Sequence, residues 1–161
     1  MISICIATFK REKHHDCLLH LLVGEIERPE PIEIVVCDND SARSAEDIVN
    51  AASKDADISI RYYCEPEQNI SLARNKTVHE AKGQWIAFID DDEPPHKNWL
   101  SELYKAIKTF NADGAFGPVE PKFPQRSGFI ADINVVLFST PNTSGYKIKN
   151  AQYGSLWQCI G

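Results

Sequence analysis

Three consecutive aspartates carry the strongest chemical signal in this chain of 161 residues. Asp90, Asp91 and Asp92 directly follow the apolar residues 85–89. Two carboxylates about 4 Å apart repel each other by roughly 4 kcal/mol at an effective dielectric constant near 20. A bound cation relieves this repulsion, and Mg²⁺ typically takes one or two carboxylates together with phosphate oxygens. The triplet therefore predicts a site for a divalent cation and a diphosphate.

The alternation of side chains along an extended chain predicts how the three acids divide their roles. Residues two apart share one face of a strand, so Asp90 and Asp92 should work together while Asp91 points away as a bystander or brace. Asp91 is still expected close enough to the nucleotide to belong to its binding site. An alternative is that the acids only precede a helix beginning near Pro95, since helix starts favour acidic residues.

Two further polar residues lie near the ends of predicted elements. Asp38 ends the apolar run 32–37, and its carboxylate could accept a hydrogen bond from the N–H of a pyrimidine base. The alternative is a simple turn, because residues 38–41 have good turn chemistry. Arg74 lies early in a predicted helix, where it could reach a phosphate or brace the acids. An exposed arginine without a ligand is the alternative there.

The first apolar run, residues 2–7, is followed by Thr8, Phe9, Lys10 and Arg11. The hydroxyl of Thr8 and the nearby backbone could contact a base or ribose, and the cationic side chains could meet a diphosphate. A solvated loop without a ligand is the alternative interpretation.

Strands and helices alternate through the part of the chain that must position these residues. Continuous apolar runs predict buried parallel strands, and helical periodicity predicts the segments between them. The expected strands are residues 2–7, 32–37, 58–63 and 85–89, with a fifth inside 112–119. The expected helices are residues 17–26, 44–53, 71–82 and 95–110. The fold class is therefore α/β, an open and mostly parallel sheet with helices on both faces.

The pattern changes after Pro118, which divides the chain at about residue 120. Residues 1–120 are predicted to form a ligand-binding α/β subdomain, because ligands of such sheets bind beyond the carboxyl ends of the strands. Residues 121–161 are expected to begin a second region. Within it, residues 129–138 are ambiguous between helix and strand, and residues 139–161 are polar.

Composition narrows the possible functions. A net charge of −6 and a pI near 5.3 argue against a nucleic-acid partner. The sequence has no G-x-G-x-x-G or P-loop motif, which argues against dinucleotide and ordinary NTPase sites. The five cysteines include no C-x-x-C pair, so Cys5 and Cys37 are expected to be buried free thiols. With no apolar stretch of about 18 residues, the chain is expected to be soluble and cytoplasmic.

Taken together, these segments resemble the family 2 glycosyltransferases, an inverting group with the GT-A fold. The matching segments are Thr8-Phe9-Lys10-Arg11, Asp38 at the end of the second strand, Ala73-Arg74-Asn75, and the Asp-x-Asp motif Asp90-Asp91-Asp92. The resemblance covers about residues 1–120 and is specific as a set. The following residues Glu93-Pro94-Pro95 and Trp99-Leu100 also resemble bacterial members that build surface polysaccharides.

The resemblance implies a nucleotide diphospho-sugar donor, linked to UDP, and a saccharide or lipid-linked saccharide acceptor. The base would contact Asp38, Thr8 and Arg11, and Mg²⁺ or Mn²⁺ would lie on Asp92 with Asp90 nearby. Transfer would invert the anomeric carbon, and the enzyme would work with membrane-associated machinery at the inner face of the membrane.

This sequence departs from the family pattern at two places. Asn69 stands where members usually have a glycine, and we expect asparagine to tolerate the same left-handed backbone. The family's catalytic base is a carboxylate beyond the fifth strand, whereas the last acid here is Asp132. The base is therefore unassigned, and the chain is expected to be a truncated GT-A domain with weak or no transfer of its own.

Two other functions remain open from the sequence. A sugar nucleotidyltransferase would also use acids and a metal, but it usually has a glycine-rich loop after the first strand. A non-catalytic receiver-like domain would have its acid pair after the first strand, where this chain has Thr8 and Phe9.

Overall fold

The computed structural model describes residues 1–117 and 159–160 of the chain. The strands are β1 (Ile2–Thr8), β2 (Ile32–Asp38), β3 (Ser59–Cys64), β4 (Trp85–Phe88), β5 (Ala115–Phe116) and β6 (Cys159–Ile160). The helices are α1 (Glu12–Gly24), α2 (Glu46–Asp55), α3 (Ile70–Glu80) and α4 (Trp99–Phe110). The predicted strands and helices up to residue 117 are all present, with ends shifted by a few residues.

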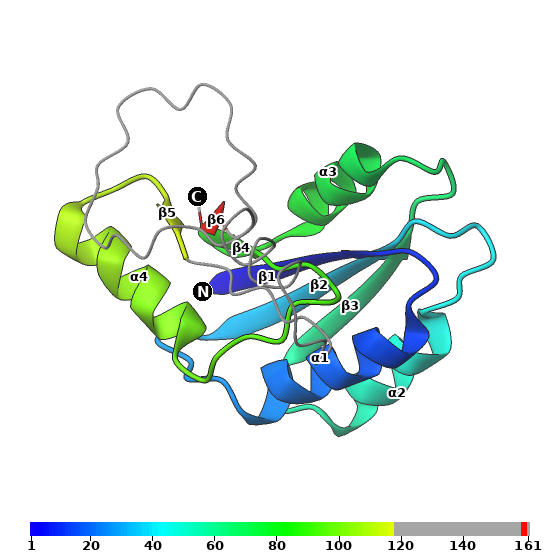
Figure 1. The fold of residues 1–161 in the computed structure, drawn as a ribbon, viewed down its shortest axis with the longest axis horizontal. Helices are drawn as coiled ribbons and strands as arrows, with labels where there is room; N and C mark the ends of the chain where they lie inside the picture. Colours follow the sequence, from blue (N-terminus) through cyan, green and yellow to red (C-terminus); the bar gives the residue numbers. More distant parts are fainter. Residues whose placement is uncertain (118–158, 161) are drawn as a thin grey trace, which may run out of the picture.

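One sheet connects all the strands, in the order β3-β2-β1-β4-β6-β5 (Figure 1). The four longer strands are parallel, and β6 pairs antiparallel with both β4 and β5. The predicted open, mostly parallel sheet is confirmed. Strand β6 was not predicted, because two residues are too few to show a hydrophobic alternation. The proposed boundary at residue 120 and the ambiguous segment 129–138 lie outside the described residues.

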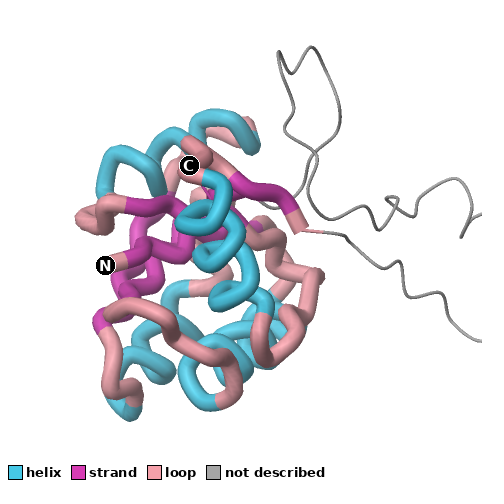
Figure 2. The backbone as a smooth tube through the Cα atoms, turned by 90° about the vertical axis from the view of Figure 1, so that its left-hand side faces the viewer, coloured by secondary structure: helices cyan, strands magenta, loops and turns pink. Residues whose placement is uncertain are grey.

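The two faces of the sheet carry side chains of different size. On one face Ile2, Ile4 and Ile6 of β1 join a large apolar cluster with α1, α2 and α4. On the other face Ala7 packs with Ala73 of α3. Figure 1 shows α3 across the sheet from α1 and α2, and Figure 2 shows the strands between layers of helices. The predicted arrangement of helices on both faces is confirmed.

Gly83 lets the connection between α3 and β4 approach the sheet closely. A Cβ atom on Gly83 would lie 2.6 Å from the backbone nitrogen of Ser3. Helix α3 already ends at Glu80, so Gly83 serves this close packing and not the end of the helix. The close contact fixes where β4 starts, and hence where the acids that follow it lie.

Cys5, Cys17, Cys37 and Cys64 are free thiols, and Cys5 and Cys37 are buried as predicted. Burial raises the pKa of Cys5 to about 11 and that of Cys37 to about 12, so both thiols stay protonated at neutral pH. Within the described residues, no helix is long and apolar enough to cross a membrane.

Candidate functional site

The carboxyl ends of β1, β2 and β4 meet at one edge of the sheet. Thr8 and Asp38, the last residues of β1 and β2, face each other in the parallel register. Just beyond β4, the N–H of Ile89 donates to the carbonyl of Cys5 on β1 at 3.3 Å. The chain therefore follows β1 as it enters the acidic triplet, and the acids come to lie beside the end of β1.

Asp91 is the acid that is fixed to β1. The hydroxyl of Thr8 donates a hydrogen bond to Asp91 Oδ2 at 2.7 Å, and both residues are buried, at 3% and 7% exposed. Arg11 Nη1 donates to the other oxygen, Asp91 Oδ1, at 3.2 Å. With a partner on each carboxylate oxygen, Asp91 joins the end of β1 to the loop that follows β4.

Asp92 is the most exposed acid of the triplet, with 46% of its side chain accessible. Its carboxylate forms an ion pair with the same Arg11 Nη1 that contacts Asp91. The hydrogen bond to Asp92 and the charge of Asp91 raise the pKa of Arg11 above its ordinary value. The guanidinium therefore stays cationic and bridges two acids.

Asp90 pairs with a different arginine, which comes from α3. Arg74 Nη2 donates to Asp90 Oδ1 at 2.6 Å, and both side chains are partly buried. Buried Ala73 and Thr77 hold this face of α3 against the sheet. The predicted proximity of Arg74 to the acids is therefore present, and the helix delivers it from the opposite side to Arg11.

The structure corrects the predicted orientation of the acids within the triplet. Strand β4 ends short of the acids, and the backbone turns at Asp91 and Asp92. The alternation of an extended chain therefore does not continue through them. Asp91 and Asp92 both contact Arg11, so the prediction that Asp91 points away from its neighbour was wrong.

Asp38 is completely buried, and its oxygens already have donors. The N–H of Asp40 donates to Asp38 Oδ1 at 2.9 Å, and the N–H of Ala45 donates to Oδ2 at 2.8 Å. Tyr62 on β3 adds its hydroxyl to Oδ2 at 3.2 Å. The turn interpretation of this segment describes these contacts well. A base could reach the Asp38 carboxylate only if the loop 39–45 moved.

Phe9 and Lys10 occupy the loop between Thr8 and Arg11. Lys10 has a φ of 55°, a left-handed conformation that is uncommon for a residue with a side chain. Its Nζ atom lies 5.0 Å from the centre of the half-buried Phe9 ring. The loop thus places one aromatic ring and two cationic side chains around the end of β1.

The donor atoms at this edge are carboxylate oxygens, which suit hard cations such as Mg²⁺ and Mn²⁺. Among the described residues, no three His, Cys, Asp or Glu side chains are grouped closely enough to hold a metal by themselves. A site of this kind fits a cation that takes one or two protein carboxylates and completes its shell with phosphate and water.

Comparison with known proteins identifies the family. The model of Glycosyl transferase family 2 matches residues 3–160. The chain belongs to glycosyl transferase family 2. Membership favours the glycosyltransferase interpretation over the nucleotidyltransferase and receiver-like alternatives.

A relative of this family 2 chain is the succinoglycan biosynthesis protein ExoM of Rhizobium meliloti, which is 30% identical over 122 residues. That match covers 76% of the chain but 40% of ExoM, so the chain spans well under half of this relative's length.

Two solved structures share the fold. Residues 1–349 of Staphylococcus aureus TarS, crystallised with UDP-GlcNAc, superpose with a TM-score of 0.63 and 21% identity over 78% of this chain and 37% of that TarS chain. The Pyrobaculum calidifontis mannosyltransferase PcManGT, with GDP-Man and Mn²⁺, gives 0.65 and 17% over 71% of this chain and 34% of its own. The predicted GT-A fold is confirmed.

In this family 2 chain, Asn69 replaces the usual glycine for a reason that differs from the prediction. Its backbone is extended, with a φ of −156°, and its side-chain oxygen accepts from the N–H of Ser71 at 2.9 Å. Asn69 is therefore the N-cap of α3, a position that asparagine fills well. The expected left-handed conformation was wrong, and the cap fixes the start of the helix that carries Arg74.

Sequence reasoning missed two residues that shape this edge. Tyr62 supports Asp38, and Asn39 donates to the carbonyls of Glu65 and Glu67 at 2.9 and 2.6 Å. These two bonds tie the end of β2 to the loop before α3. The polar residue directly after a buried strand was a signal for Asn39, although its partners lie too far along the chain to be predicted.

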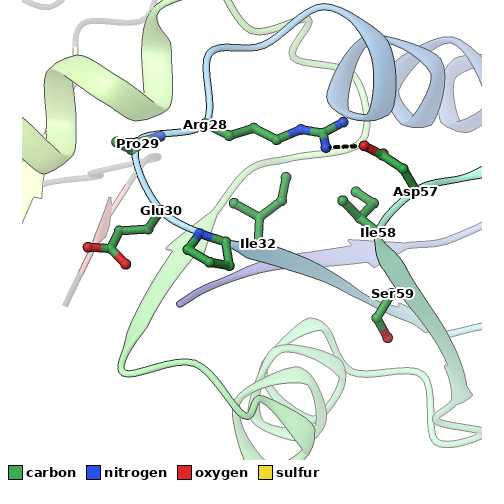
Figure 3. Close-up of a pocket in the computed structure, with 8 residues that line it drawn as sticks. Arg28, Pro29, Glu30, Ile32, Asp57, Ile58 and Ser59 are labelled. Atoms are coloured by element: carbon green, nitrogen blue, oxygen red, sulfur yellow. Dashed lines mark hydrogen bonds and ion pairs between the residues drawn. The ribbon is translucent and has the colours of Figure 1, made fainter.

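A surface pocket lies at the other edge of the sheet, where β2 and β3 begin (Figure 3). An ion pair of 2.8 Å between Arg28 Nη1 and Asp57 Oδ2 crosses it above Ile32 and Ile58. None of the predicted site residues lines this pocket. The pocket and the acids therefore lie at opposite ends of the parallel strands of this family 2 chain.

Proposed function

We propose that this chain forms the donor-binding part of a metal-dependent glycosyltransferase that uses a UDP-linked sugar. The observation that carries the proposal is the junction of the acidic triplet with Arg11 and Arg74 where β1 and β4 end. Carboxylates for a cation and guanidinium groups for phosphate are thereby gathered at one place. Family membership and the UDP-GlcNAc complex of a similar fold support this choice.

The acids fit a divalent cation by chemistry and by access. Asp92 is half exposed, so its carboxylate can be reached from solvent, whereas Asp91 is buried. Asp92, with Asp90 nearby, would hold Mg²⁺ or Mn²⁺, which when bound supplies Lewis-acid stabilisation of the departing diphosphate. The PcManGT structure holds Mn²⁺ together with GDP-Man, which supports the same class of cation here.

The other residues would position the nucleotide. We assign Thr8 and Phe9 to the ribose and base, because they border the end of β1 beside Asp91. Arg74 would keep Asp90 in place and add positive charge near the phosphates. Asp38 would act mainly through the loop that it holds, because its carboxylate is completely buried and already accepts from the N–H groups of Asp40 and Ala45.

The whole protein would complete the reaction. An acceptor hydroxyl of a saccharide or lipid-linked saccharide, activated by a carboxylate base, would attack the anomeric carbon in line with the departing diphosphate. The new glycosidic bond forms as the bond to the diphosphate breaks, and the anomeric configuration inverts.

Nucleotide binding tests the proposal directly. In calorimetry, the native chain is expected to bind UDP in the presence of MnCl₂ and to lose this binding in excess EDTA. Asp92→Asn removes one negative charge from the exposed carboxylate, and we expect it to weaken the binding of UDP with Mn²⁺ at least about tenfold. Its fold should be intact, because exposed ion pairs contribute at most about 1 kcal/mol.

A matched control is Asp57→Asn, which neutralises an exposed aspartate at the opposite edge of the sheet. This variant should bind UDP and Mn²⁺ like the native chain. Absence of UDP binding by the native chain, or equal binding with Mn²⁺ and with EDTA, would contradict the proposed function.

A further inference from the structure

The most exposed carboxylate of the triplet has a cationic partner of its own. A single nitrogen of Arg11, Nη1, contacts Asp92 and also lies 3.2 Å from Asp91 Oδ1. Arg11 is itself 49% exposed, so the bridge lies at the surface of the site. The guanidinium thus occupies the same carboxylate that the proposed cation needs.

The two arginines of the site are held very differently. Arg74 comes from a helix whose Ala73 and Thr77 are buried against the sheet, and its partner Asp90 is 25% exposed. Arg11 lies in the loop that leads into α1, and no side chain caps the helix there. A long side chain in such a loop can change rotamer without moving the fold, so Arg11 is the arginine that can leave.

We propose that Arg11 and the divalent cation exclude each other on Asp92, so that cation binding releases Arg11 to the diphosphate of the donor. The inference rests on the proposed function and deepens it. Arg11 would be a positioning residue that exchanges one anionic partner for another as the donor site fills.

Electrostatics explain both why Arg11 would leave Asp92 and why it would then bind the diphosphate. A guanidinium that shares a carboxylate with a divalent cation a few ångströms away meets strong like-charge repulsion, so one of the two must move. A guanidinium also recognises phosphate oxygens with paired N–H groups, which makes the diphosphate a suitable second partner. Asp91 stays behind, because its hydrogen bond from Thr8 at 2.7 Å does not depend on Arg11.

The proposal predicts opposite effects of one substitution on two ligands. Arg11→Gln is expected to tighten the binding of Mn²⁺ alone about three- to tenfold. The cation no longer competes with the Arg11 guanidinium for the Asp92 carboxylate, and an exposed ion pair of this kind is weak. The same variant should bind UDP about tenfold more weakly at saturating Mn²⁺, since a charged partner of the diphosphate is lost. The free Mn²⁺ signal in electron paramagnetic resonance measures the first effect, and calorimetry measures the second.

Lys54→Gln serves as the charge-matched control, because it removes one positive charge from the exposed end of α2. It should change neither affinity. If Arg11→Gln left Mn²⁺ affinity unchanged or weakened it while the native chain still bound UDP with Mn²⁺, the exchange would be refuted and the proposed function would stand. If the native chain bound neither ligand, both would fall.

Discussion

A Glu33→Ala variant is expected to lose about 3 kcal/mol of unfolding free energy, a large part of the roughly 5–15 kcal/mol by which a domain is stable. Glu33 lies in the middle of the parallel sheet and is 3% exposed. Removing one partner of a buried ion pair leaves the other charge without compensation, which is why the expected loss is large. Urea unfolding of the full chain measures it.

The loss is large because Glu33 joins several elements. Its Oε1 atom accepts from the hydroxyl of Ser3 and from the N–H of Lys82, both at 2.6 Å. Its Oε2 atom accepts from Arg61 Nη2 at 2.8 Å. These bonds join β1, β2, β3 and the connection between α3 and β4, so the same carboxylate also sets the position of the elements that carry Arg74 and the acids.

The pH dependence of stability gives a second test of Glu33. Burial raises its pKa, but the hydrogen bonds from Ser3, Lys82 and Arg61 outweigh burial and hold the pKa below the ordinary value of 4.5. Folding therefore favours the ionised form. The resulting stability is present above about pH 4.5 and is lost as the pH falls through the folded-state pKa. Glu33→Gln should lack this acid-dependent part.

A surface pair provides the comparison. Glu46→Ala removes the partner of Arg43 at 2.8 Å on exposed α2, where such pairs contribute less than about 1 kcal/mol. Equal losses for Glu33→Ala and Glu46→Ala would show that the buried network does not stabilise the sheet.

The elements were predictable because their signals are local. Apolar runs such as residues 32–37 mark strands buried on both faces, and Asn69 is a good helix start whatever its distant partners. Glu33 is an example of a residue whose contacts could not be predicted from local signals. The run contains one charged residue, and the sequence does not reveal that its partners come from positions 3, 61 and 82.

The position of the candidate site could be predicted from the sequence, but the orientation of its side chains could not. Parallel strands bring their carboxyl ends to one edge, so the gathering of Thr8, Asp38 and the acids followed from the fold class. The orientation of each acid depended on the backbone after β4, which ends at Phe88, one residue before the predicted end. The extended alternation does not continue through the acids, and this changes which side chains share a partner. That Arg11 bridges Asp91 and Asp92 also needed the structure, because a loop conformation sets it.

Asp38→Asn is expected to lower the free energy of unfolding by about 2 kcal/mol, although it preserves the shape of the side chain. Both carboxylate oxygens accept from backbone N–H groups, of Asp40 at 2.9 Å and of Ala45 at 2.8 Å. An amide has one oxygen, so either orientation turns its NH₂ group towards an N–H donor and leaves a buried donor unsatisfied. Urea unfolding measures this effect.

Asp40→Asn is the matched control, because the described contact of its carboxylate is one bond, from the N–H of Ala42 to Oδ1 at 3.1 Å. An amide oxygen can still accept that bond, so the change should be below about 1 kcal/mol. If Asp38→Asn were as stable as the native chain and lost only UDP binding, Asp38 would act on the nucleotide directly, as the sequence first suggested. A loss of stability comparable to the expected value would instead assign Asp38 to holding the loop between β2 and α2, with its effect on UDP following from that loop.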